Sequence, residues 1–138
     1  MKFFIVLCVV LLALNIVSGK KKPDDEEKAK SLKKVLKECQ KNDATKIDNS
    51  VLKKLKKHKQ VDLPENYGDH KLCILKGLGY INEDNTVNED NLKKRVTKKA
   101  EEDQDIDAIV SECKVSKATP KETALFIETC LNSHSINL

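Results

Sequence analysis

The chain has 138 residues, with 26 Lys and Arg against 22 Asp and Glu, and a formal net charge of +4. This length suits one domain rather than two. The net charge is small and both signs are interleaved, which excludes a dedicated nucleic-acid binder. Only three aromatic residues follow position 19, so any binding pocket would have to be mostly aliphatic.

Residues 1–19 are predicted to be a secretory signal peptide. One lysine precedes an unbroken apolar run over residues 3–14, and small residues follow at Val17-Ser18-Gly19. A membrane anchor is the alternative, but the run is shorter than the ~20 residues needed to span a bilayer and lysines follow it at once. We therefore expect a secreted, extracellular protein whose single domain covers residues 20–138.

The next segments are predicted to be helices, because apolar residues recur at helical spacing and no segment alternates long enough to indicate a sheet. The first helix, over residues 24–39, opens on a capping aspartate. The second, over about residues 44–57, carries many lysines beside its apolar face. The third covers about residues 67–78 and ends between two glycines.

Three further helices follow a loop at residues 81–85. The fourth covers about residues 88–100, and the fifth carries the apolar positions of residues 106–113. The sixth has the clearest start, at Thr119-Pro120-Lys121-Glu122. There a hydroxyl stands at the N-cap, a proline at the first helical position, and a glutamate that can complete a capping box. The fold class is therefore all-α, with six short helices.

Four cysteines remain after the predicted signal peptide, namely Cys39, Cys73, Cys113 and Cys130. An even number in an oxidising compartment predicts two disulfides and no free thiol. Zinc is the alternative, but no C-x-x-C pair occurs and the histidines lie at no ligand-like spacing, so no metal or other cofactor is expected. Spacing alone does not choose among the three pairings of four cysteines.

The context of two cysteines carries a family resemblance. Cys73 lies four residues after Asp69, and Cys130 lies nine residues after Lys121 in the segment Pro120-Lys121-Glu122-Thr123-Ala124. With cysteine at Asp69 and Lys121, these would be the C-x-x-x-C and P-C-E-T-A motifs of insect odorant-binding proteins. The chain therefore resembles that family, the pheromone and general odorant-binding proteins, in its four-cysteine "minus-C" subgroup. The turn Glu83-Asp84-Asn85 is similar to the family's D-E-D-G turn, with Asn at the left-handed position.

The resemblance implies six helices around an apolar cavity, with Cys39 paired to Cys73 and Cys113 to Cys130. It implies a non-enzymatic carrier that binds odorants, pheromones or other apolar molecules and lipids, and delivers them, with an olfactory receptor as a downstream partner. A monomer or weak dimer is expected. It also places Asp69 opposite Lys121 across the third and sixth helices, close enough for an ion pair.

A dry aliphatic cavity binds many apolar ligands at micromolar strength, because each buried methylene contributes roughly 0.8 kcal/mol. Eight residues on the apolar stripes are the predicted ligand contacts, and plain core packing is the alternative for each. They are Leu52, Leu55, Leu75, Val96, Ile109, Val110, Phe126 and Ile127.

The histidines are weak candidates for a pH switch. His58 and His70 are expected to be solvated, whereas His134 lies in a tail that could cover the cavity. The acidic segment 82–91 lacks the glycine and the ligand spacing of a calcium loop.

Two alternatives remain from the sequence. Lysine-rich segments at residues 31–37 and 51–57 are typical of an antimicrobial-like helical protein at membrane surfaces, but neighbouring acidic runs favour solvated helix faces and no stable membrane association. The second alternative is a biogenic-amine scavenger on the same fold. An enzyme is not expected, because no Ser/His/Asp order, activated cysteine, paired catalytic carboxylates or phosphate loop appears.

Overall fold

The computed structural model describes residues 23–138, with side chains from Ser31 onward, so the predicted signal peptide lies outside the described residues. Within this range the chain is all-α, as predicted, and one isolated bridge joins Ile81 to Val87. The helices are α1 (Pro23–Cys39), α2 (Asn49–Lys56), α3 (Tyr67–Gly77), α4 (Glu89–Lys99), α5 (Ile106–Cys113) and α6 (Pro120–Ser133).

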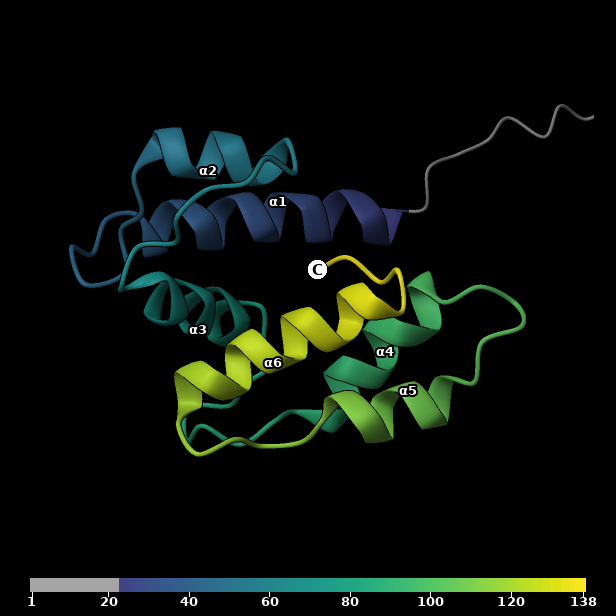
Figure 1. Cartoon of the computed structure of the whole chain (residues 1–138). Helices are drawn as coiled ribbons and strands as arrows, with labels where there is room; N and C mark the ends of the chain where they lie inside the picture. Colours follow the sequence, from purple (N-terminus) through teal and green to yellow (C-terminus); the bar gives the residue numbers. More distant parts are fainter. Residues whose placement is uncertain (1–22) are drawn as a thin grey trace, which may run out of the picture.

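The helix α6 lies at the centre of the domain (Figure 1). It packs against α3 on one side and α5 on the other, while α1 packs against α3 and α4 against α5. The helix α2 lies beyond α1 in Figure 1 and has no fully buried residue of its own. The main core forms among α4, α5 and α6, with Leu75 of α3 and Ile136 of the tail.

Two disulfides tie the helices together. Cys39–Cys73 links α1 to α3 with a Cα–Cα distance of 6.0 Å, and Cys113–Cys130 links α5 to α6 with 5.5 Å. Both distances lie in the usual range for a disulfide. The pairing implied by the family resemblance is thus confirmed.

The local signals at helix ends are mostly confirmed. At α6 the Thr119 side chain accepts from the Glu122 N–H while the Glu122 carboxylate accepts from the Thr119 N–H, which is the predicted capping box. Asn85 has a φ of 68°, the left-handed conformation expected in the turn after α3. Asn88 and Asp105 cap α4 and α5 with their side chains.

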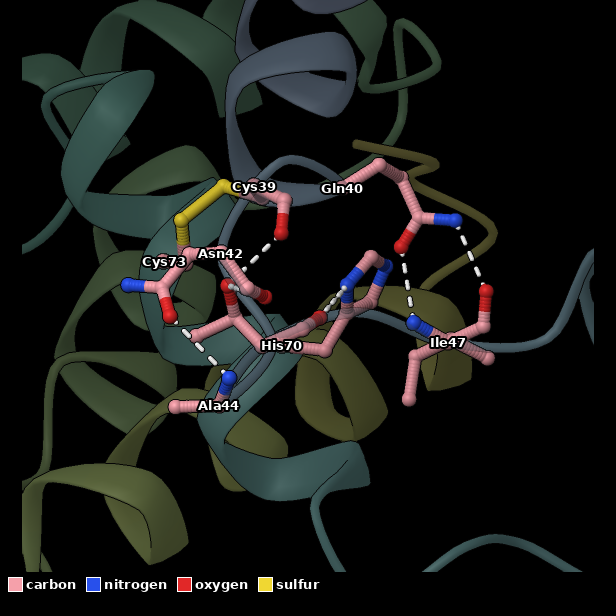
Figure 2. Close-up of a disulfide and its surroundings, with 8 residues drawn as sticks. Cys39, Gln40, Asn42, Ala44, Ile47, His70 and Cys73 are labelled. Carbon is pink, nitrogen blue, oxygen red and sulfur yellow. Dashed lines mark hydrogen bonds between the residues drawn. A yellow bond between two sulfur atoms is a disulfide. The ribbon is translucent and has the colours of Figure 1, made fainter.

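The predicted second helix begins too early. The structure starts α2 at Asn49 rather than residue 44, because the Gln40 side chain holds the backbone of Ile47 (Figure 2). Its Oε1 accepts from the Ile47 N–H at 2.7 Å, and its Nε2 donates to the Ile47 carbonyl at 2.8 Å. With its N–H and carbonyl both bonded to the Gln40 side chain, Ile47 does not take part in the backbone hydrogen bonds of a helix. Asp48 therefore caps α2, and its side chain accepts from the Ser50 N–H.

The expectation that His70 is solvated is wrong. Its side chain is 1 % exposed, and its Nδ1 lies 2.7 Å from the Thr45 carbonyl oxygen (Figure 2). Since a carbonyl only accepts, Nδ1 carries the hydrogen. The Thr45 hydroxyl in turn donates to the Cys39 carbonyl at 2.6 Å. His70 therefore ties α3 to the loop after α1, next to the Cys39–Cys73 disulfide.

Burial lowers the pKa of His70, although its hydrogen bond to Thr45 acts in the opposite direction. In the unfolded chain a histidine titrates near ~6.5, so below that pH the unfolded state binds more protons than the folded state. We therefore expect the free energy of unfolding to fall as pH is lowered from neutrality through this range. Urea midpoints at neutral and mildly acidic pH measure it.

The matched variant is His70→Asn, whose side-chain amide can still donate to Thr45 but does not titrate. Its urea midpoint should depend less on pH than that of the wild type. His58→Asn, at an exposed position, should keep the wild-type dependence. Identical pH dependence in wild type and His70→Asn would show that another group is responsible.

The predicted ion pair between α3 and α6 is present. Lys121 Nζ lies 3.4 Å from Asp69 Oδ2, and both side chains are substantially exposed. The two helices approach closely here, since a Cβ added at Gly68 would lie 3.2 Å from Lys121 Cβ. An exposed pair of this kind stabilises a protein by only about 0.2 to 1 kcal/mol.

A disulfide in place of this pair should stabilise the domain more, by up to about 2 to 5 kcal/mol. We expect Asp69→Cys with Lys121→Cys to oxidise spontaneously and to raise the melting temperature, whereas neither single substitution does so. Thiol titration and thermal denaturation give the readouts. Two free thiols persisting under mild oxidant would show that the two α-carbons stand too far apart.

Candidate functional site

A cavity of about 430 Å³ lies between α1, α2, α3, α6 and the C-terminal tail. Figure 1 shows the C-terminal end of the chain between α1 and α6. The volume falls within the roughly 300 to 1,000 Å³ typical of small-molecule sites. Apolar side chains form much of its lining: Leu32, Leu36, Leu55, Ile74, Leu75 and Leu138.

The apolar lining has a floor and walls. Ile74 and Leu75 of α3 are buried and form the floor, while Leu32 and Leu36 of α1 are half-buried. Leu32 and Leu36 are one turn apart, which places both on the same face of the helix. Leu55 comes from α2. Four exposed polar residues also line the cavity: His58, Thr129, Asn132 and Asn137.

The tail that brings Leu138 to the cavity is fixed by several contacts. Ile136 is fully buried, and its N–H donates to the Leu131 carbonyl at 2.9 Å. The Arg95 guanidinium donates to the Asn137 carbonyl. His134 points elsewhere: its Nε2 lies 3.0 Å from a carboxylate oxygen of Glu112 on α5, and it does not line the cavity.

The lining also contains a polar group that is mostly covered from solvent. Lys71 of α3 forms an ion pair with Glu128 of α6, and their side chains are only 18 % and 20 % exposed. The Lys71 Nζ also lies over the ring of Tyr67, 5.2 Å from its centroid. Tyr67 and Lys71 are one helical turn apart, so α3 presents both to the same side. We call these three residues the polar trio.

The ionisation of the polar trio follows from its surroundings. Burial alone lowers the pKa of Lys71, but the attraction of the Glu128 carboxylate and the hydrogen bond to it outweigh this effect and place the pKa above its usual value. Burial raises the pKa of the Tyr67 hydroxyl. At neutral pH the cavity wall therefore holds an ammonium paired with a carboxylate, beside an uncharged phenol.

Two of the eight predicted ligand contacts, Leu55 and Leu75, line this cavity. The remaining six lie outside its lining: Leu52, Val96, Ile109, Val110, Phe126 and Ile127. Val96, Ile109, Val110 and Ile127 are buried in the core among α4, α5 and α6. Phe126 is half-buried under the Lys117 ammonium, 3.7 Å from its ring centroid. Ligand contact by these eight residues stays a prediction.

Sequence reasoning did not select the polar trio or two leucines of the wall. Leu32 and Leu36 lie four residues apart within the first predicted helix, so their helical spacing could have found them. The pairing of Lys71 with Glu128 joins positions 57 residues apart. Helical periodicity assigns such charged residues to solvent-facing positions, so it offers no signal for this pair.

Cys113, Cys130 and His134 form the one group in the described part of the chain whose ligand atoms are close enough to hold a metal ion. The two sulfurs are bonded to each other, and a disulfide does not supply the thiolates that metals bind. Among the described residues, no helix is long and apolar enough to cross a membrane.

A small helical domain held by two interhelical disulfides, with a partly aliphatic cavity between its helices, has the architecture of a small-molecule binding protein. The chain matches the model of the PBP/GOBP family, the insect odorant-binding proteins, over residues 21–134, and it belongs to that family. Members are non-enzymatic binding proteins, and membership implies a carrier of small hydrophobic ligands.

Two relatives come from Tenebrio molitor. The B2 protein and the B1 protein are each 28 % identical to this chain over 106 residues, which cover 77 % of the chain and 80 % and 79 % of the relatives, respectively. No solved structure matches the chain significantly.

Paired truncations separate the cavity from the core. Val96→Ala removes two methyl groups from a fully buried position and should cost about 1.5 to 3 kcal/mol of stability with little change in ligand affinity. Leu55→Ala alters a half-buried cavity wall, so it should cost less stability and weaken binding of an apolar probe such as N-phenylnaphthylamine. Urea denaturation and probe titration measure both. If Val96→Ala weakened probe binding and Leu55→Ala did not, the ligand would lie in the core instead.

Proposed function

We propose that the protein is a secreted carrier that takes up small apolar molecules, such as odorants, pheromones or lipids, in the cavity between α1, α2, α3, α6 and the tail. The observation that carries this proposal is the cavity itself, because its buried floor is aliphatic and two disulfides link the helices of the domain around it. Family membership supports the same function.

The energetics suit a carrier of moderate affinity. A micromolar dissociation constant corresponds to about −8.2 kcal/mol. Burying roughly ten methylenes contributes a free energy of that order, before the cost of association is subtracted. Aliphatic walls make no directional contacts, so many chains of suitable length should fit.

We also infer that the chain is a four-cysteine member of its family. Asp69 and Lys121 stand where the family resemblance implies two further cysteines, and their ion pair supports this alignment. A disulfide there would contribute about 2 to 5 kcal/mol, whereas the exposed pair contributes about 0.2 to 1 kcal/mol. Because α3 and α6 both line the cavity, their weaker connection should ease the entry and exit of ligands.

The two alternatives have less support. In α2 the lysines are exposed, but Leu55 lines the cavity and is not free to insert into a membrane surface. A cationic amine would meet the Lys71 ammonium in the cavity wall, which disfavours the role of a biogenic-amine scavenger.

Probe binding tests the carrier function. The wild type should bind N-phenylnaphthylamine at a single site, and medium-chain aliphatic competitors should displace the probe better than charged amines. Leu36→Trp places a bulky ring in the cavity and should reduce probe affinity about tenfold or more. The control is Val115→Trp, because Val115 is exposed and lies outside the lining.

Circular dichroism should show both tryptophan variants folded. Equal probe affinity in Leu36→Trp and the wild type would place the binding site elsewhere. If no apolar competitor displaces the probe, or if anionic vesicles sediment the protein, the carrier function is overturned.

A further inference from the structure

We propose that the polar trio selects ligands with a neutral, hydrogen-bonding head group, a hydroxyl above all, over carboxylates and amines of the same chain length. This inference rests on the proposed function and narrows its ligand class. It follows from the placement of the Lys71–Glu128 pair, mostly covered from solvent, in the lining beside the aliphatic residues of the cavity.

The polar trio is the part of the lining that can distinguish charges. The titratable residues among the described residues lining the cavity are His58, Tyr67, Lys71 and Glu128. His58 is exposed, so water screens it. Lys71 and Glu128 are about four-fifths covered and lie beside the buried floor residues Ile74 and Leu75. Charge interactions are stronger at such a partly desolvated position than at the surface.

Each charged head group meets a like charge there. A carboxylate attracted to Lys71 would approach Glu128, and an ammonium attracted to Glu128 would approach Lys71. Because the two charges form one pair, a charged ligand binds either one only by weakening the pair or by accepting the repulsion. The removal of the ligand's own charge from water adds a further cost.

A hydroxyl avoids both costs. The Lys71 ammonium has three N–H donors and the Glu128 carboxylate has about four acceptor positions, so each keeps bonding capacity beyond the pair. A ligand hydroxyl can donate to Glu128 and accept from Lys71 while the pair stays intact. A plain hydrocarbon would cover the pair without offering hydrogen bonds in return, which is unfavourable.

The test is displacement of N-phenylnaphthylamine at neutral pH by decanol, decanoate and decylamine, which differ only in the head group and the carbon that bears it. On the wild type, decanol should compete at about tenfold lower concentration than the other two, which corresponds to about 1.4 kcal/mol. A competitor ranking with decanoate or decylamine first would overturn the inference.

Charge variants should then shift the relative affinities of decanoate and decylamine in opposite directions. Glu128→Gln leaves an unpaired ammonium, so decanoate should gain about tenfold in affinity and decylamine should not. Lys71→Met leaves an unpaired carboxylate, so decylamine should gain and decanoate should lose. The matched controls are Glu89→Gln and Lys114→Met, which break a more exposed pair outside the cavity and should leave the wild-type ranking unchanged.

A double variant covers the case in which a single variant does not fold. Lys71→Met with Glu128→Met replaces the pair by apolar groups, an exchange that proteins often tolerate. The wild type should prefer decanol over a matched ester, because an ester accepts hydrogen bonds but cannot donate one to Glu128. The double variant should bind the probe but lose this preference. If this preference persists, the Lys71–Glu128 pair does not select the head group and the inference is overturned, although the protein remains a carrier. If none of the three decyl compounds displaces the probe from the wild type, the carrier function fails as well.

Discussion

The packing of α3 against α6 is the contact on which the rest of the structure depends. One disulfide ties α1 to α3 and the other ties α5 to α6, but neither joins α3 to α6. These two disulfide-linked groups of helices therefore meet across a noncovalent contact. Two ion pairs cross it, the exposed Asp69–Lys121 and the mostly covered Lys71–Glu128, where Gly68 lets the helices approach closely.

The cavity opens beside this same contact, which gives Lys71 and Glu128 two roles. As a pair they hold α3 to α6, and as part of the lining they face any bound ligand. The loss of one partner leaves a covered charge uncompensated and is more damaging than the replacement of both. An ion pair at this position therefore constrains the ligand chemistry as well as the packing. A ligand that breaks the pair also weakens the contact that shapes its own site.

Much of the fold follows from local patterns, and the failures occur where distant residues meet. The capping box at Thr119 and the bounds of α4 and α5 depend on neighbouring positions, so they could be predicted. The start of α2 depends on Gln40, seven residues before Ile47. The buried His70 is hydrogen-bonded to the carbonyl of Thr45, 25 residues away in the sequence. In the cavity, Leu55 and Leu75 could be selected from their apolar stripes. The Lys71–Glu128 pair could not, because residue type alone assigns both partners to solvent.

Leu75 connects the cavity to the core. Its side chain is fully buried, forms part of the cavity floor, and belongs to the core cluster with residues of α4, α5 and α6. Leu75 packs against the buried side chains of this cluster. Other lining residues come from α1 and from α2, and α2 has no fully buried residue. The cavity thus has one side that belongs to the core and another to which α2 contributes without a fully buried residue. A ligand that fills it contacts both, and because it binds only the folded protein, its binding free energy adds to the stability of the whole domain. Since α2 has no fully buried residue of its own, the contacts of a ligand with Leu55 should add to the packing of this helix in particular.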